Sequence, residues 1–338
     1  MRERTAVRLR IIVGVTVLSA AIGAAYGARF APPAINVTYS AVTGASSGFA
    51  LCTLEIFLQN AAAATLRRLP VVVGLALRTV AYGAVFVAAA AIAAALSGLV
   101  MPEGSARGML LRPSPSFSIA VALAFNFVFT LRGLFGGRTL LALVTGRYHR
   151  PRVEARIVLF LDLHESTPIV ERLGDIDFHR FLNRVFYDIN DPVIEAGGEI
   201  YRYVGDEIIV TWPLARGARD GACLVCLFAI ADALALRRGD YRSAFGAEPR
   251  LRGALHAGPL VVGEMGDMKR EIVMLGDTMN TASRIEDACR ATGSDAIASE
   301  AVLRAIGTLP PGIAATRLEA MPLRGKTGAV ALFALRRA

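Results

Sequence analysis

The fold of this chain is decided by two stretches, Val158-Leu-Phe-Leu-Asp-Leu-His-Glu-Ser-Thr167 and Glu199-Ile-Tyr-Arg-Tyr-Val-Gly-Asp-Glu-Ile-Ile-Val-Thr-Trp212. The apolar run Ile157–Leu161 predicts a buried strand that carries Asp162 at its end. The second stretch predicts a hairpin of strands Glu199–Val204 and Ile208–Trp212, with Asp206 in the turn. Because Mg²⁺ prefers one or two carboxylates together with substrate phosphates, two aspartates on adjoining strand ends predict a site for a divalent cation.

The composition divides the chain into two parts. Of its 28 acidic residues, only Glu3, Glu55 and Glu103 precede residue 151, and this first part is rich in Ala, Val and Leu. A membrane part followed by a soluble part is the simplest explanation. The net charge of +9 comes from basic residues that are scattered and often flank apolar runs. Nucleic-acid binding is therefore not expected, since no basic patch with interleaved aromatic residues is present.

Four apolar segments in the first part predict transmembrane helices, at about 11–27, 41–66, 71–100 and 118–137. A helix needs about 20 apolar residues to cross the hydrocarbon of a bilayer. The first segment could be a signal peptide, because arginines precede it, but retention as an anchor is favoured since more spans follow. Residues 138–152 are expected to be a linker with a helical start, and 153–338 a separate domain.

The placement of arginines predicts that both ends of the membrane part face the cytoplasm. Arginines precede the first span, lie between the second and third at Arg67 and Arg68, and follow the fourth, whereas the connection 31–40 carries no charge. The chain is then a multi-pass protein of the inner (plasma) membrane with a cytoplasmic domain. Glu55 falls within the second span, where it is either a functional group or pairs with Gln59 or a nearby arginine.

The soluble part mixes predicted strands and helices. Beyond the two opening stretches, one helix is expected to be capped by Ser166, a second to start near Phe178, a third to be buried at Gly221–Leu236 and a fourth to open at Asp277. Strands are expected at Leu251–His256, Ile272–Gly276 and Val330–Leu335. The Gly-Pro pair within 257–263 predicts a turn into a further strand. This order predicts an α/β sandwich with a mostly antiparallel central sheet.

The four cysteines do not form a recognisable framework. Cys223 and Cys226 have a C-x-x-C spacing but lie in the predicted buried helix. We expect reduced core residues rather than a redox or metal site.

Six motifs of the soluble part resemble the class III nucleotidyl cyclases, the family of adenylate and guanylate cyclases. They are Leu159-Phe-Leu-Asp162-Leu, Gly197-Gly198, Arg202-Tyr-Val-Gly-Asp206, His256-Ala-Gly-Pro-Leu-Val-Val-Gly263, Leu275-Gly-Asp-Thr-Met-Asn280-Thr-Ala-Ser-Arg284 and Arg324-Gly-Lys326. The likeness extends from about Arg152 to Leu335, and the preceding part is similar to that of membrane-bound bacterial members. The resemblance implies a ferredoxin-like α/β catalytic domain.

The resemblance also implies roles for the residues at matching positions. Asp162 and Asp206 match the two metal-binding aspartates, and the backbone carbonyl of Leu163 matches a further ligand, for two Mg²⁺ or Mn²⁺ ions per site. Asn280 matches the residue that orients the ribose, and Arg284 the one that stabilises charge on the α-phosphate. Alone, Asp162 could be a helix N-cap and Asp206 a turn residue, but the four side chains together favour the site.

Substrate contacts follow from the same resemblance, with two departures. Arg324 and Lys326 lie where the family has triphosphate-binding lysines. Arg202 stands at the adenine-selecting lysine position, and Val273 stands at the position of its usual Asp or Thr partner. Arginine's planar fork does not replace a lysine's point donor, and valine cannot accept a hydrogen bond. The Glu/Cys pair expected of a guanylate cyclase is also absent, so ATP is favoured over GTP.

These observations predict a membrane-anchored adenylate cyclase that makes 3′,5′-cyclic AMP and pyrophosphate. In the family, the metal aspartates and the Asn/Arg pair act from opposite subunits, so one chain that carries both sets implies a homodimer with two equivalent sites. The alternatives are a cyclase of altered purine choice, and a catalytically silent membrane receptor whose cyclase-like domain dimerises or binds nucleotide.

Overall fold

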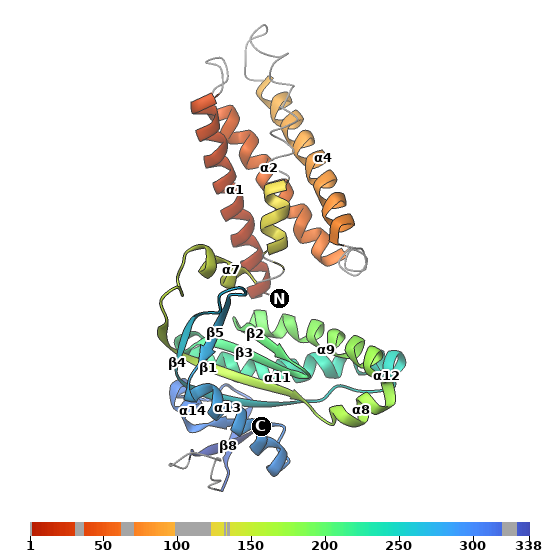
Figure 1. The fold of residues 1–338 in the computed structure, drawn as a ribbon, viewed down its shortest axis with the longest axis vertical. Coiled ribbons are helices and arrows are strands. Elements are labelled where there is room, and N and C mark those ends of the chain that lie inside the picture. Colours follow the sequence, from red (N-terminus) through yellow and green to blue (C-terminus); the bar gives the residue numbers. More distant parts are fainter. Residues whose placement is uncertain are drawn as a thin grey trace. The chain divides into compact units, whose positions relative to one another are not determined.

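The computed structural model describes residues 2–30, 37–61, 71–98, 123–131, 133, 136–319 and 330–338. The chain separates into two compact units, which we call the helical unit, Thr5–Val144, and the sheet unit, Thr145–Ala338 with Met1–Arg4. Figure 1 shows the elements of both. Arg324 and Lys326, the predicted triphosphate-binding residues, lie outside the described residues.

Apolar helices make up the helical unit. They are α1 Arg2–Phe30, α2 Val37–Ala61, α4 Val71–Gly98, a helix at 123–131 and α7 Gly137–Val144. Within the described residues one stretch, Leu9–Arg29, is long and apolar enough to cross a membrane, and a shorter apolar stretch covers Val73–Ala88. The four predicted spans include residues 62–66 and 118–122, which lie outside the description, so the four-span arrangement stays a prediction.

Small residues line the contact between α1 and α2. They recur at every fourth position, as Ser19, Gly23 and Gly27 of α1 and Ser40, Gly44 and Gly48 of α2. A Cβ atom at Gly23 would lie 2.2 Å from the backbone oxygen of Ser40, and one at Gly44 would lie 2.2 Å from that of Ser19. Only glycine allows the two backbones to approach this closely, and such contacts are typical of helices that associate in membranes.

Glu55 is buried between α2 and α4. Its carboxylate accepts a hydrogen bond from the Tyr82 hydroxyl and lies 3.8 Å from Nη1 of Arg78. On the same helix α4, Thr79 Oγ1 accepts a hydrogen bond of 2.8 Å from the Asn126 amide. Glu55 therefore has partners inside the helical unit, and among them Arg78 of α4 is a nearby arginine of the kind that the sequence suggested.

The sheet unit is built on one mixed sheet (Figure 1). The strand order is β2-β3-β1-β4-β6-β8-β7, with β5 pairing to β4. The pair β4–β6 is parallel, and the other strand pairs are antiparallel. The bounds are β1 Arg152–Leu163, β2 Glu199–Val204, β3 Glu207–Pro213, β4 Leu251–Met265, β5 Glu271–Leu275, β6 Ala296–Ser299, β7 Ile313–Arg317 and β8 Leu332–Arg337. The predicted, mostly antiparallel sheet is confirmed.

Helices cover the sheet and enclose its core. They are α8 Ser166–Leu173, α9 Asp175–Glu195, α10 Leu214–Ala218, α11 Ala222–Leu236, α12 Arg238–Phe245, α13 Asp277–Thr292 and α14 Glu300–Ile306. The core joins α9 and α11 to the odd-numbered residues of β1, from Ile157 to Leu163. Because side chains alternate along a strand, Asp162 lies on the other face of β1, on which α13 packs.

The structure corrects the predicted turn at 257–263. Strand β4 continues from Leu251 to Met265, because it pairs with β1 from Leu251 through Val262. Pro259 is tolerated because it lies between the segments of β4 that pair with β6 and with β5. A Cβ atom at Gly258 would lie 2.5 Å from Oγ1 of Thr278, so this glycine permits the close approach of α13.

The predicted cap of α8 is also wrong. Ser166 is the first residue of that helix rather than its cap. Glu165 precedes it in the left-handed conformation, with φ of 55°, and makes no side-chain capping bond. The strand that ends after Asp162 needs a tight reversal into α8, and the left-handed residue supplies it.

Candidate active site

Asp162 is buried and is held by two arginine side chains. It is the second-last residue of β1, its side chain is 6% exposed, and it stands directly opposite Arg252 of β4. Nη2 of Arg252 donates a hydrogen bond of 3.2 Å to Asp162 Oδ2, and Nη2 of Arg290, from α13, donates one of 2.9 Å to the same oxygen. The predicted strand-end carboxylate is therefore held by two guanidinium groups.

Asp206 lies at the same end of the sheet. It follows Gly205, whose φ of 63° forms the β2–β3 turn, and is half-buried. Strand β3 pairs with β1 as far as Ile208 opposite Leu161. Continuing this register by two residues brings Asp206 level with Leu163, beside Asp162. The hairpin prediction is confirmed, and sheet pairing explains how residues 44 positions apart in the chain are brought together.

Four carboxylates share this corner of the sheet unit. Burial, together with the negative charges of Glu286, Asp162 and Asp206, raises the pKa of Glu207 to about 7. Burial and the charge of Asp162 likewise raise the pKa of Glu286 to about 7. Crowded carboxylates with raised pKa values indicate that the corner lacks positive charge, even with Arg252 and Arg290 present.

The donor chemistry fits a hard divalent cation. Carboxylate oxygens are the ligands that Mg²⁺ and Mn²⁺ prefer, and excess negative charge at a buried corner favours a cation. Within the described residues, however, no three His, Cys, Asp or Glu side chains converge on one coordination position. We define the acidic corner as Asp162, Asp206, Glu207 and Glu286.

Helix α13 presents two chemically different faces. Its buried face carries Glu286 toward Asp162, together with apolar residues such as Ile285. Asn280 is exposed and Arg284 half-buried, and their four-residue spacing puts them on a shared face. Among the described contacts, neither has a hydrogen bond or ion pair to Asp162 or Asp206. A single chain thus brings the two aspartates together but does not bring the Asn/Arg pair to them.

The predicted base-reading positions lie around β5. Arg202 of β2 is exposed and forms an ion pair of 2.7 Å with Glu271, the first residue of β5. Hydrogen bonding to Lys269, together with the charge of Arg202, holds the pKa of Glu271 below its ordinary value. Val273 is half-buried, two residues after Glu271, so both side chains lie on the same face of β5. Arg202 therefore has a carboxylate partner, although not at position 273.

Sequence reasoning missed Arg252, Glu271, Glu286 and Arg290. A partial signal was present for three of these residues. Glu271 lies two positions before Val273 and so shares its face of the strand. Glu286 and Arg290 are spaced four apart on the helix that carries Asn280, and Nη2 of Arg290 lies 3.1 Å from Glu286. The spacing indicates an ion pair along the helix but not its contact with β1.

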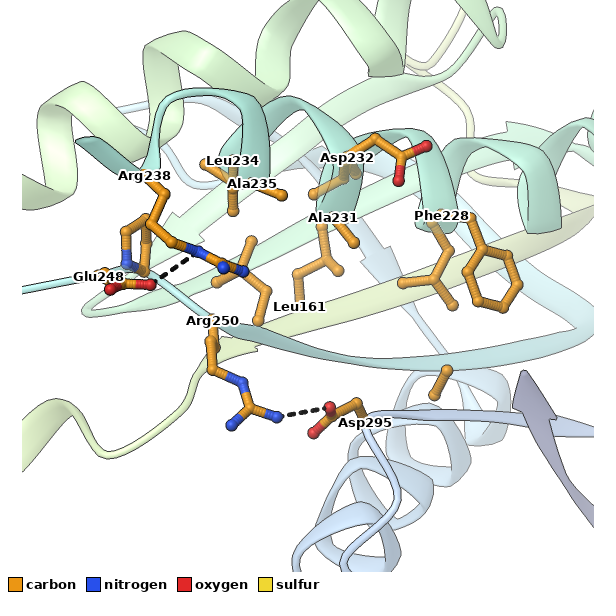
Figure 2. Close-up of a pocket in the computed structure, with 15 residues that line it drawn as sticks. Leu161, Phe228, Ala231, Asp232, Leu234, Ala235, Arg238, Glu248, Arg250 and Asp295 are labelled. Carbon is orange, nitrogen blue, oxygen red and sulfur yellow. Dashed lines mark hydrogen bonds and ion pairs between the residues drawn. The ribbon is translucent and has the colours of Figure 1, made fainter. Parts of the chain in front are cut away.

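A cavity of about 310 Å³ lies on the opposite side of β1 from Asp162. Figure 2 shows it between α11 and the start of β4, with Leu161 in its floor and the ion pairs Arg238–Glu248 and Arg250–Asp295 at its rim. Neither Asp162 nor Asp206 is among the residues that line it. The acidic corner is thus separate from this cavity.

Comparison with known proteins identifies the family and several relatives of this chain. Residues 149–336 match the family described as the adenylate and guanylate cyclase catalytic domain. The chain is 40% identical over 210 residues to "Adenylate cyclase 2" of Rhizobium meliloti (strain 1021), covering 61% of this chain and 57% of that protein. It is 28% identical over 184 residues to "Adenylate cyclase" of Anabaena cylindrica, covering 52% and 36%. The chain thus spans less than two thirds of these relatives.

Solved structures share the fold. A bacterial light-regulated adenylyl cyclase superimposes with a TM-score of 0.55 at 17% identity, over 64% of this chain and 63% of that one. The adenylyl cyclase CyaB from P. aeruginosa superimposes with a TM-score of 0.50 at 18% identity, over 56% and 97%. The match to the cyclase family covers residues 149–336, which is more than half of this chain. The chain therefore belongs to the adenylate and guanylate cyclases, the class III nucleotidyl cyclases.

Proposed function

We propose that this chain is a membrane-anchored adenylate cyclase that converts ATP into 3′,5′-cyclic AMP and pyrophosphate. The observation that carries the proposal is the buried Asp162 at the end of β1, beside the turn with Asp206, in a chain of the cyclase family. ATP as the substrate is supported by the 40% identity to an adenylate cyclase of Rhizobium meliloti.

The acidic corner would hold two Mg²⁺ or Mn²⁺ ions through Asp162, Asp206 and the carbonyl of Leu163. When bound, such ions favour the ionised ribose 3′-hydroxyl and neutralise triphosphate charge. The 3′-oxygen attacks the α-phosphorus in line, and the bond from that phosphorus to the pyrophosphate oxygen breaks. Phosphoryl transfer needs mainly positioning and positive charge, so Asn280 orients the ribose and Arg284 stabilises charge on the α-phosphate.

The remaining substrate contacts are assigned to the triphosphate and the base. Arg324 and Lys326 bind the triphosphate, for which their positive charge suits them. Arg202 reads the purine beside Val273. Its ion pair with Glu271 brings that carboxylate to the same region of the sheet unit.

Two copies of the chain complete the site. Asn280 and Arg284 lie on α13 without a contact to the acidic corner of their own chain in the described structure, which supports their acting on the partner subunit's aspartates. A two-fold homodimer then has two equivalent sites, since the same surface serves both chains.

The helical unit anchors the enzyme. Leu9–Arg29 provides one span. The small-residue contact between α1 and α2, and the arginine distribution, support several spans in the inner membrane with the sheet unit in the cytoplasm.

A cyclase of altered purine choice is the second candidate, and the Arg202–Glu271 pair favours it. A carboxylate can accept hydrogen bonds from a purine, whereas Val273 cannot. In this candidate, Glu271 would accept hydrogen bonds from guanine.

The test is product analysis with each purine. The detergent-solubilised full chain is incubated with Mn²⁺ and either ATP or GTP, and the products are identified by mass spectrometry. We expect 3′,5′-cyclic AMP from ATP, its loss in Asp162→Ala, and its retention in Asp267→Ala, an exposed control in the β4–β5 loop. Cyclic GMP alone would establish the second candidate. No cyclic product from either substrate would contradict both and favour a silent receptor.

A further inference from the structure

Two arginines with different surroundings share one oxygen of Asp162. Arg252 reaches Oδ2 from the neighbouring strand at 3.2 Å with a side chain that is 14% exposed. Arg290 reaches the same oxygen from α13 at 2.9 Å, and its side chain is 52% exposed. Arg252 is thus part of the packed sheet, whereas Arg290 approaches from the solvent side.

Arg290 also serves a second carboxylate. Its Nη2 lies 3.1 Å from Oε1 of Glu286, whose side chain is 5% exposed. One guanidinium group therefore lies between two buried carboxylates. Because isolated buried charges are strongly unfavourable, this arrangement stabilises the acidic corner while it holds no other cation.

A divalent cation that binds Asp162 would compete with Arg290 for this carboxylate. Arg290 already donates to Asp162 Oδ2, and two positive charges within a few ångströms of each other repel strongly where water is partly excluded. The pair with Arg290 is the one that gives way, because an ion pair with an exposed side chain contributes little free energy. Its guanidinium can turn into solvent, whereas that of Arg252 is enclosed by the sheet.

We propose that Arg290 is a resident counter-cation of Asp162, which a divalent cation must displace, and that it thereby lowers the cation affinity of the site. This inference rests on the proposed role of Asp162 as a metal ligand. Arg252 is a positioning residue that keeps the carboxylate in place when Arg290 leaves. The fraction of sites that hold a metal ion then depends on competition with the guanidinium group of Arg290.

The direct test is Mn²⁺ binding to the full chain in detergent without nucleotide, followed by the electron paramagnetic resonance signal of free Mn²⁺. Removing one partly exposed charge pair corresponds to a change of roughly two- to five-fold in an equilibrium constant, so Arg290→Gln should bind Mn²⁺ tighter by about that factor. The matched control is Arg304→Gln, which removes an exposed pair of the same i,i+4 spacing with Glu300 on α14. It should leave Mn²⁺ affinity unchanged.

Thermal unfolding separates competition from a structural role. Without metal, Arg290→Gln should unfold at a lower temperature than the wild type, because the carboxylates lose their counter-charge. With saturating Mn²⁺ the difference should disappear, because a ligand that binds only the folded chain stabilises the tighter-binding variant more. A merely structural arginine would leave the same deficit in both conditions.

Asp162→Asn distinguishes the possible failures. The inference is overturned if the wild type binds Mn²⁺, Asp162→Asn weakens that binding, and Arg290→Gln binds no tighter than the wild type. If Asp162→Asn binds Mn²⁺ as tightly as the wild type, Asp162 is not a metal ligand. In that case both the proposed metal role of Asp162 and the inference about Arg290 fail. In the Asp162→Asn background, Arg290→Gln should no longer increase Mn²⁺ affinity.

Discussion

Arg202 has a carboxylate partner that the cyclase motifs do not include. Its guanidinium group pairs with Glu271 at the start of β5, and Glu271 is also paired with Lys269. A flat guanidinium fixed in this way presents its donors along a different line from a lysine ammonium. We therefore propose that the choice of purine depends on how Arg202 divides its hydrogen bonds between Glu271 and the base.

Arg202→Lys should raise the preference for ATP over GTP. A lysine restores the compact donor that the family places at this position, and one changed hydrogen bond corresponds to roughly two- to ten-fold in selectivity. The measurement is the ratio of kcat/KM for the two nucleotides, with Arg180→Lys, at an exposed pair on α9, as the control. An unchanged ratio would mean that Arg202 does not read the base.

Cys223 should be unreactive in the folded protein. It is buried in α11, and burial raises the pKa of its thiol to about 12, so almost no thiolate is present at pH 8. Ellman's reagent should therefore modify it slowly at pH 8 in native protein and rapidly in guanidinium chloride, as followed by mass mapping. Rapid modification of the native protein would show that α11 is not packed as described.

Individual site residues differed in how far the sequence predicted them. The places of Asp162 at a strand end and of Asp206 in a hairpin turn were predictable, because the apolar runs Ile157–Leu161 and Ile208–Trp212 are typical of strands. Arg252 and Arg290 were not, since their contacts with Asp162 join residues 90 and 128 positions apart. Glu271 had an available signal, because strand periodicity puts it on the face of Val273.

At the scale of elements, helix α13 carries both Glu286 of the acidic corner and the Asn280–Arg284 pair. Its first turn packs on Gly258 and Pro259 of β4, where the Thr278 hydroxyl donates a hydrogen bond of 2.6 Å to the Pro259 carbonyl. This anchor fixes which side of the helix faces the acidic corner. The sequence predicts the helix and its Asn/Arg spacing, but the turn wrongly predicted at 257–263 would have interrupted the strand on which the helix docks.

The small-residue contact between α1 and α2 makes a second element-scale prediction. Gly23→Ala should lower the thermal midpoint of the detergent-solubilised chain, because its Cβ would meet a backbone oxygen, and such overpacking costs about 1–3 kcal/mol. Gly14→Ala in the same helix meets nothing within 4 Å and should keep or raise the midpoint, since alanine favours helices. Circular dichroism measures both. Equal midpoints would contradict close packing of α1 on α2.

At the scale of the whole molecule, the chain combines an apolar helical unit with a sheet unit of the cyclase family. The sequence predicts such a division, because acidic residues are almost confined to the second part. The completion of the active site by a second copy remains a proposal, which the family resemblance implies and which one chain does not test. Within one chain the aspartates and the Asn280–Arg284 face of α13 have separate surroundings.

The most direct test of the proposed shared site mixes two inactive chains. Asp162→Ala and Asn280→Ala are each expected to form no cyclic AMP from ATP and Mn²⁺. When the two are co-expressed, random pairing into two-fold dimers leaves about a quarter of the sites intact, so activity should return to roughly that fraction of the wild type. Inactive mixtures in which heterodimers are proven by differential tags, or substantial activity of either variant alone, would contradict the account.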